Sequence, residues 1–202
     1  GEGGVNPATI EYFQGVERLC RERDILFMVD EVQTGLARTG RWFGFQHFGI
    51  KPDVITMAKA LGNGVPIGAC WARREVASAF QPGDHATTYG GQPLATAAAR
   101  AVLETMVAID APNRAVEAGA AIQEAVKALP GVSGVRGLGL LLAVELSDLD
   151  ARDVAARCLE RGLVVNGVTP SALRMAPALT ITPEHIAEAA TILGGVLTEM
   201  AA

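Results

Sequence analysis

A short apolar segment that ends on two adjacent carboxylates constrains the fold of this chain more than any other feature. Residues 26–29 are uniformly apolar, Asp30 and Glu31 follow directly, and a glycine-containing loop, "VQTGLARTGR", comes next. A short apolar run of this kind is typical of a strand in the buried parallel sheet of an α/β protein. Ligands of open parallel sheets bind at the carboxyl ends of the strands, so Asp30 is a candidate site residue. Glu31 is expected to face the other way and to make a structural contact.

The first part of the chain alternates helical and strand patterns. Apolar residues at helical spacing predict a helix over residues 7–23, with Pro7 in its first turn and Asn6 as its cap. Short strands are expected at residues 25–30, 52–58 and 66–73, and an alanine-rich helical region at residues 91–129 with a break near Pro112. This order predicts an α/β fold with a parallel-rich sheet.

The character of the sequence changes after Pro130. One glycine-led strand is expected at residues 134–146, a helix at 151–162, short strands at 163–166 and 172–177, and a terminal helix that Thr182 caps ahead of Pro183. The sequence therefore predicts part of a large domain over residues 1–105, a helical connection over residues 106–130 and a small α+β domain over residues 131–202.

Composition narrows the kinds of partner and compartment. The 17 lysines and arginines are scattered along a chain of formal net charge -5, which argues against a nucleic-acid footprint. The apolar stretches are interrupted well before the roughly 18 residues that span a bilayer, so no membrane partner is expected. Three cysteines far apart in the sequence, Cys20, Cys70 and Cys158, give neither a disulfide framework nor a metal-ligand pair and suit a reducing cytoplasm.

A lysine follows the second expected strand much as Asp30 follows the first. Lys59, in "VITMAKALGNGVPIGA", has small neighbours that let a bulky group approach its amine. By itself Lys59 is read most simply as an exposed lysine, and Asp30 as a surface charge or a cap. At one edge of a sheet, an amine that can form a Schiff base and an acid that keeps a pyridine nitrogen protonated are the minimal set for pyridoxal phosphate. The hydroxyls and glycines of "HATTYGG", residues 85–91, are a candidate phosphate site ahead of a helix.

Other classes of protein explain fewer of these residues. "GLARTGR" has the glycine spacing of a phosphate-binding loop, but Arg41 and Trp42 stand where lysine and serine or threonine are required. A dinucleotide fold is disfavoured because Gly134, Gly137 and Gly139 precede their strand. An aldolase or decarboxylase without cofactor would use Lys59 and leave the acid and the "TTYGG" turn unexplained. A degenerate scaffold that has lost catalysis stays open as the non-enzyme alternative.

Three segments give the chain a specific resemblance. They are "GEGG", "VDEVQTGLARTGRWFGFQHFGIKPDVITMAKALGNGVPIGA" and "HATTYGGQPLATAAA". With these segments the chain resembles the class III pyridoxal-phosphate aminotransferases of fold type I, and within that family it is most similar to the acetylornithine aminotransferases. The likeness covers the whole chain and is strongest over residues 1–99. It implies part of the large cofactor-binding domain followed by the small C-terminal domain.

The resemblance implies a role for each matching residue of the cofactor site. Lys59 would carry pyridoxal phosphate and move the substrate proton, and Asp30 would pair with the pyridine nitrogen. Gln33 would approach the phenolic oxygen, and Val32 would pack on one face of the ring. Thr88 would reach the phosphate of the cofactor in the partner subunit, which implies a homodimer with shared active sites.

The resemblance also implies how the substrates are recognised. Arg174, in "LRMAP", would hold the α-carboxylate of glutamate or 2-oxoglutarate through a bidentate contact. Glu2, in "GEGG", would pair with Arg174 when the amino donor is bound. The implied reaction moves the amino group of N2-acetylornithine to 2-oxoglutarate, in arginine biosynthesis and in the cytoplasm. Ornithine, succinylornithine and 4-aminobutyrate aminotransferases share the same core and remain alternatives.

The chain matches about half of the family pattern. Absent from the sequence are the upstream phosphate-binding turn, the aromatic residue that stacks on the cofactor, and the arginine for the distal carboxylate of the donor. Either these residues are part of a longer enzyme or the product is truncated or clipped, and in both cases we expect the 202 residues alone to be inactive.

Overall fold

The computed structural model describes residues 1–202, which form two compact units. The mixed-sheet unit comprises Ala8–Ala37 and Arg41–Ala111, and the antiparallel-sheet unit comprises Gly1–Pro7, Arg38–Gly40 and Pro112–Ala202. The division next to Ala111 lies inside the region expected to connect two domains. The first seven residues, however, group with the C-terminal part of the chain. Each unit is described by itself.

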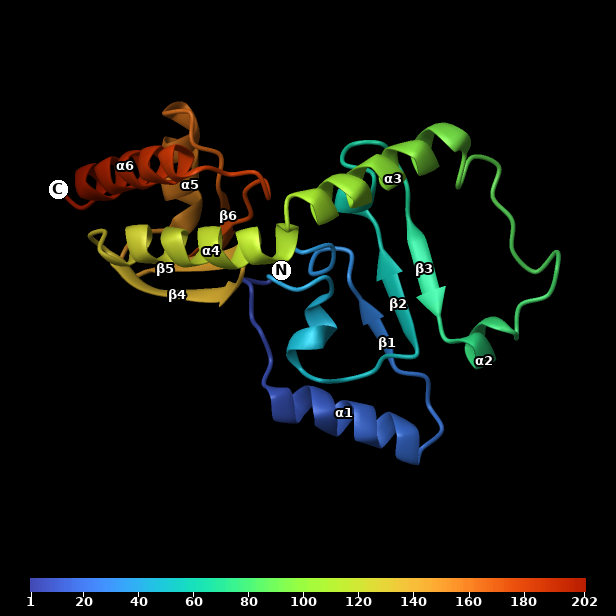
Figure 1. Ribbon diagram of the computed structural model, residues 1–202. Helices are drawn as coiled ribbons and strands as arrows, with labels where there is room; N and C mark the ends of the chain where they lie inside the picture. Colours follow the sequence, from blue (N-terminus) through green and yellow to red (C-terminus); the bar gives the residue numbers. More distant parts are fainter. The chain divides into compact units, whose positions relative to one another are not determined.

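The mixed-sheet unit holds three strands in the order β1-β2-β3 (Figure 1). Its elements are α1 (Ile10–Glu22), β1 (Met28–Asp30), the 3-10 helix η1 (Gly44–His47), β2 (Val54–Met57), the 3-10 helix η2 (Lys59–Leu61), β3 (Ala69–Ala72), α2 (Arg74–Ala77) and α3 (Pro93–Ala108). Strand β1 is parallel to β2, and β3 is antiparallel to it. All three strands lie within the ranges expected from the sequence, although the sheet of this unit is mixed.

Helix α1 begins later than expected. The hydroxyl of Thr9 accepts a hydrogen bond from the amide of Tyr12, so Thr9 is the N-cap. The prediction of Asn6 as the cap was wrong, because the side-chain amide of Asn6 donates to the carbonyl of Gly3 instead. Both residues are good caps by type, and only the three-dimensional path of Gly1–Pro7 decides between them.

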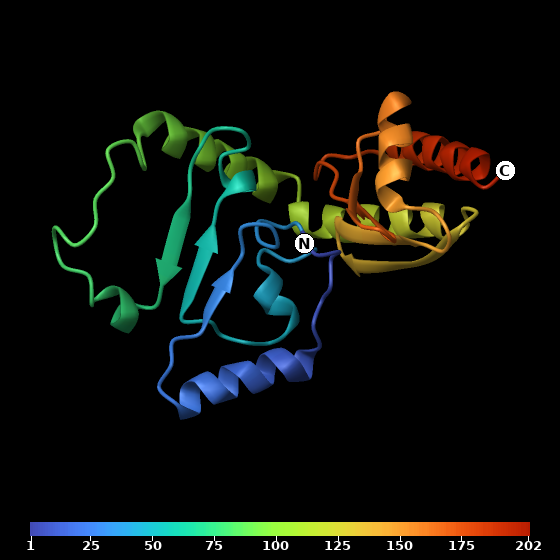
Figure 2. The same cartoon turned by 180° about the vertical axis from the view of Figure 1, so that it is seen from behind.

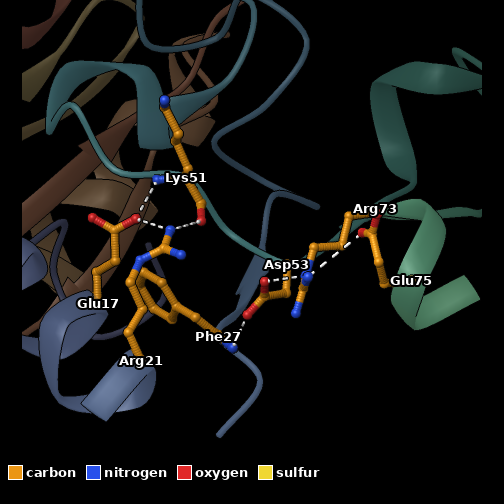
Figure 3. Close-up of polar contacts among 7 residues, drawn as sticks. All are labelled: Glu17, Arg21, Phe27, Lys51, Asp53, Arg73 and Glu75. Atoms are coloured by element: carbon orange, nitrogen blue, oxygen red, sulfur yellow. Dashed lines mark hydrogen bonds and ion pairs between the residues drawn. The ribbon is translucent and has the colours of Figure 1, made fainter. Parts of the chain in front are cut away.

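A carboxylate beside the sheet ties the three strands together (Figure 3). Asp53, just before β2, accepts a hydrogen bond of 2.8 Å from the amide of Phe27, just before β1. Its other oxygen pairs with Nε of Arg73, just after β3, at 2.5 Å. These contacts support the register in which Met28 is opposite Val54 and Asp30 is opposite Thr56.

Strands β1 and β3 of the mixed-sheet unit are less buried than their sequence predicts. The expected buried segment contains one buried apolar side chain, Phe27, while Met28 is 59% exposed. Trp71 of β3 is also half exposed. The prediction of a strand buried on both faces was therefore wrong for β1 as it stands in this chain.

The antiparallel-sheet unit has four strands in the order β4-β5-β7-β6. Its elements are α4 (Ala111–Lys127), β4 (Val132–Leu138), β5 (Leu141–Leu146), α5 (Ala151–Glu160), β6 (Asn166–Thr169), β7 (Ala172–Met175) and α6 (Pro183–Met200). Every strand pair is antiparallel. The single strand expected at residues 134–146 is a hairpin. Gly139 lies at its turn with φ +54, where a Cβ would lie 2.6 Å from the carbonyl carbon of Thr39.

The core of this unit lies on one face of the sheet. Alternate residues Leu142, Val144 and Leu146 of β5, with Leu173 of β7, pack with apolar residues of α4, α5 and α6. The ribbons of these helices lie beside the sheet in Figure 2. The opposite face carries a second, small apolar cluster in which Val5 packs with Leu141, Ala143 and Ala172. Alternation along the strands thus gives the sheet two packed faces, one covered by helices and one contacted by the N-terminal segment.

Two further details bear on the sequence predictions. Thr182 caps α6 and Pro183 is its first residue, as predicted. The break in the long helical region falls at Asp110, with φ +50, two residues before Pro112. None of the helices is both long and apolar enough to cross a membrane.

Candidate active site

An acid and a lysine follow the carboxyl ends of two neighbouring parallel strands. Asp30 is the last residue of β1, in register with Thr56 of β2, and Lys59 lies three residues beyond Thr56. Both side chains are exposed. Because parallel strands end at the same edge of a sheet, a carboxylate and an amine are available at that edge.

Asp30 uses one oxygen to shape the loop that follows it. Its Oδ1 accepts a hydrogen bond of 2.9 Å from the amide of Val32. The acid side chain thus closes a turn at the start of the loop. Val32 and Gln33 are half-buried in this loop. The two residues predicted to flank a ring therefore lie two and three positions after the predicted acid, in the loop that its side chain shapes.

Glu31 is buried and fully engaged in hydrogen bonds. It is 2% exposed, and its carboxylate accepts from the hydroxyl of Thr34 at 2.5 Å, the amide of Gly44 at 2.9 Å and the amide of Phe45 at 2.8 Å. A buried carboxylate is tolerated when its oxygens receive such donors. Glu31 thereby fastens the loop after β1 to η1, which confirms the structural contact expected from the sequence.

Lys59 occupies a backbone conformation that favours glycine. Its φ is +46, and it opens η2, where its carbonyl accepts from the amides of Gly62 and Asn63 at 3.2 and 3.3 Å. Gly62 is required there, because a Cβ would lie 1.9 Å from the carbonyl oxygen of Val65. A lysine in this region stores roughly 1 kcal/mol of strain, and such outliers concentrate at functional sites.

The candidate phosphate loop is an exposed turn. The hydroxyl of Thr87 accepts a hydrogen bond of 3.1 Å from the amide of Gly90, and Thr88 lies between them with an exposed side chain. Gln92 and Pro93 then begin α3. The turn precedes a helix, as expected, and its affinity for phosphate stays a prediction.

The second group of predicted residues lies in the antiparallel-sheet unit. Nη1 of Arg174, on β7, pairs with Oε1 of Glu2 at 2.5 Å, and Nη2 donates to Oδ1 of Asn166 at 3.4 Å. The Arg174 side chain is 16% exposed and that of Glu2 is 72% exposed. Nε of Arg174 is buried without a hydrogen-bond partner. A largely buried guanidinium with a spare donor is suited to a carboxylate ligand.

A mostly apolar cavity of about 340 Å³ adjoins this arginine. Asn166 and His185 contribute polar atoms to its wall, while Ile122, Met175 and Ile186 are among its apolar lining residues. His185 also completes the capping box of α6 with Thr182, so its part in this wall is structural.

One arginine close to this site was not singled out from the sequence. Arg136 of β4 hydrogen-bonds the carbonyl oxygens of Gly4 and Val5 and pairs with Glu145. The available signal was an arginine between glycines inside an otherwise apolar strand, "GVRGLG", because such a charge needs partners when it is half-buried.

The residues at the edge of the mixed sheet fit pyridoxal phosphate by their chemistry. Lys59 supplies an exposed amine and Asp30 an exposed carboxylate with one oxygen outside the Val32 turn. The strained backbone of Lys59 and the fixed loop after Asp30 present both groups at the sheet edge. An amine for the aldehyde and an acid for the pyridine nitrogen are the groups that this cofactor requires.

Comparisons with known proteins agree with this chemistry. The model of the class-III aminotransferase family matches residues 1–197. The chain is 46% identical to the acetylornithine aminotransferase of Gloeobacter violaceus, over 99% of this chain and 51% of the relative. It is 43% identical to that of Bacillus subtilis, over 96% of this chain and 51% of the relative. The chain belongs to the class-III aminotransferase family.

Solved structures show the same fold. The ornithine aminotransferase of Toxoplasma gondii ME49 superposes with a TM-score of 0.91 at 34% identity, covering 100% of this chain and 50% of that one. The acetylornithine aminotransferase of Elizabethkingia anophelis superposes with a TM-score of 0.88 at 31% identity, covering 98% of this chain and 52% of that one. The fold is therefore the fold type I aminotransferase fold, as predicted. The chain spans about half the length of the curated relatives that it matches.

Proposed function

We propose that this chain is the part of a pyridoxal-phosphate-dependent aminotransferase that carries the catalytic lysine, and that its reaction transfers the amino group of N2-acetylornithine to 2-oxoglutarate. The observation that carries the proposal is the placement of Asp30 and Lys59 after two adjacent parallel strands. The family membership and the identity to acetylornithine aminotransferases support it.

The residues near the edge of the mixed sheet have separate roles toward the cofactor. Pyridoxal phosphate, when bound, supplies an electron sink for the carbon that loses its proton. The amine of Lys59 would hold the cofactor, and the same amine would accept the proton from the donor carbon that bears nitrogen. The carboxylate of Asp30 would keep the pyridine nitrogen cationic, and Gln33 and Val32 would orient the ring. Thr88 would contact the phosphate of the cofactor bound to the partner subunit of a homodimer.

Substrate selection depends on Arg174 and Glu2 in the antiparallel-sheet unit. Arg174 holds a carboxylate of 2-oxoglutarate or glutamate, and Glu2 neutralises Arg174 when the amino donor occupies the site. The contact between Glu2 and Arg174 and the spare Nε donor support these roles. The enzyme would act in arginine biosynthesis in the cytoplasm.

A second donor is favoured by the structural neighbours. Several are ornithine aminotransferases, at up to 37% identity, so ornithine is the leading alternative to N2-acetylornithine, ahead of succinylornithine and 4-aminobutyrate. An inactive, truncated or degenerate domain is the remaining alternative.

The test is a donor panel. The full-length enzyme that contains these residues is purified and supplied with pyridoxal phosphate and 2-oxoglutarate, and glutamate formation is measured with each of the four donors. The proposal expects the highest kcat/KM with N2-acetylornithine. A higher kcat/KM with ornithine would make ornithine the assigned donor. No glutamate from any donor would favour the alternative of an inactive domain.

A further inference from the structure

The segment Gly1–Pro7 is fastened to the antiparallel sheet by one arginine. Nε of Arg136 donates to the carbonyl oxygen of Val5 at 3.0 Å, and Nη2 donates to that of Gly4 at 2.5 Å. Nη1 pairs with the carboxylate of Glu145 on the neighbouring strand. All three guanidinium nitrogens are used, which is a geometry that lysine cannot reproduce.

Arg136 and Arg174 lie on the same rung of the sheet. Arg136 of β4 is opposite Ala143 of β5, and Ala143 is opposite Arg174 of β7. Residues opposite each other across strands share one face, so both arginines are on the face that Val5 contacts through Ala143. The N-terminal segment is therefore held by one arginine at Gly4 and Val5, and reaches the other through Glu2.

The two attachments differ in character. Val5 is 5% exposed and packed in its cluster, and Gly4 has φ +109, with space for a Cβ limited by Arg136 Nη2 at 3.1 Å and Thr169 Cγ2 at 3.2 Å. The Glu2 side chain, by contrast, is 72% exposed. Buried, multiply bonded contacts exchange rarely, whereas a carboxylate that is mostly exposed leaves its partner more readily. Gly4 and Val5 are thus the fixed end of the segment, and Glu2 is the exchangeable end.

From this arrangement we infer that Arg136 is a positioning residue that sets how strongly Glu2 competes with substrate carboxylates for Arg174. Tethering Glu2 close to Arg174 raises its effective concentration there, so a dicarboxylate must displace it. Releasing the segment lowers that competition. The inference rests on the proposed function of Glu2 and Arg174, and it adds a residue that neither the site chemistry nor the sequence pattern required.

Binding of glutarate, a dicarboxylate that cannot be transaminated, tests the inference without relying on turnover. Calorimetry on the purified protein gives its Kd for the unsubstituted chain, Arg136→Ala, Glu2→Ala and the double variant. We expect glutarate to bind about three- to tenfold more tightly to each single variant. The double variant should gain no more than Glu2→Ala alone, because the two changes act on one competitor. Damage to the fold would weaken binding, so a gain in affinity is not explained by unfolding.

Two further variants sharpen the comparison. Arg157→Ala removes an arginine of the same unit that pairs with exposed Glu160, and should leave Kd within about twofold. The Kd of Arg136→Lys for glutarate should lie between those of the unsubstituted chain and Arg136→Ala. Lysine keeps the positive charge and loses the several N–H donors of the guanidinium. A gain with Glu2→Ala and none with Arg136→Ala would overturn the positioning role. No gain with either variant would overturn the proposed function of Glu2, and the inference with it.

Discussion

The two compact units reach their order by different means. In the antiparallel-sheet unit, Leu142, Leu173 and Leu193 are completely buried between the sheet and its helices. In the mixed-sheet unit, Met28 and Trp71 are half exposed, and the buried carboxylate of Glu31 fastens the loop after β1. Apolar burial thus dominates the antiparallel-sheet unit, whereas polar contacts have a larger share in the mixed-sheet unit. The exposed edge that carries Asp30 and Lys59 belongs to the unit with the smaller core.

The largest effect is expected at the lysine of that edge. Lys59→Ala removes the amine that holds the cofactor and moves the proton, so transaminase activity should fall by at least about 10⁴-fold. Initial-rate assays of the purified variant check this. Lys51→Ala is the matched control, since Lys51 is exposed in the same unit and makes its hydrogen bonds with Glu17 and Arg21 through its backbone. Equal losses in both variants would argue against a special role for Lys59.

Asp30→Asn should leave the fold intact and reduce activity about 10²- to 10³-fold. An amide can still accept the Val32 hydrogen bond, and it cannot keep a pyridine nitrogen cationic. Circular dichroism would verify the fold, and kcat/KM would report the loss. Full activity in a folded Asp30→Asn protein would remove the acid from the mechanism.

The contrast in burial predicts a contrast in stability. Leu173→Ala should lower the free energy of unfolding of the antiparallel-sheet unit by about 3 kcal/mol, because it opens a cavity at a fully buried site. Met28→Ala, at a side chain 59% exposed, should change stability by no more than about 0.5 kcal/mol. Denaturant titrations of the two variants compare them directly. Similar losses would show that β1 is buried in the protein as it exists in solution.

A smaller loss of stability is expected from a change in the loop after β1, which Glu31 fastens in the mixed-sheet unit. Glu31→Gln replaces one acceptor oxygen by a donor that faces the amides of Gly44 and Phe45 or the Thr34 hydroxyl. We expect a loss of about 1–3 kcal/mol in the free energy of unfolding of this unit. Gln46→Glu would serve as a nearby control at an exposed site. An unchanged unfolding midpoint for Glu31→Gln would mean that the loop is fixed by other contacts.

The smallest effect concerns the dependence of stability on pH. Burial raises the pKa of the Cys158 thiol. The thiol therefore ionises at lower pH in the unfolded chain than in the folded one, and its contribution is fully present below the ordinary thiol pKa and is lost as pH rises through the folded pKa. Unfolding titrations at neutral and alkaline pH should show a decline that Cys158→Ala reduces. An identical decline in both proteins would exclude the thiol as its source.

Much of the fold could be predicted because its signals are local. The strand before Asp30, the strand before Lys59 and the cap of α6 at Thr182 all follow from short patterns. The hairpin at Gly139 was missed because a continuous apolar run hides a turn, which depends on the close approach of Thr39. The cap at Thr9 was missed because Asn6 is an equally good cap by type and is engaged elsewhere.

The site divides in the same way. The positions of Asp30 and Lys59 after two expected strands pointed to them before the family resemblance did, and the parallel register of β1 and β2 explains why they share an edge. Two partners of Arg136, the carbonyl oxygens of Gly4 and Val5, could not be predicted, because they lie more than a hundred residues away in sequence. Contacts of this kind depend on tertiary packing and leave little trace in local sequence patterns.

Chemical trapping shows whether Lys59 carries pyridoxal phosphate. Borohydride reduction of the purified protein converts a lysine–pyridoxal linkage into a stable bond, which intact mass and peptide mapping then locate. The account predicts a pyridoxyl group on Lys59 and none on Lys51. A protein saturated with the cofactor that gives no adduct, or an adduct on a different lysine, would contradict it.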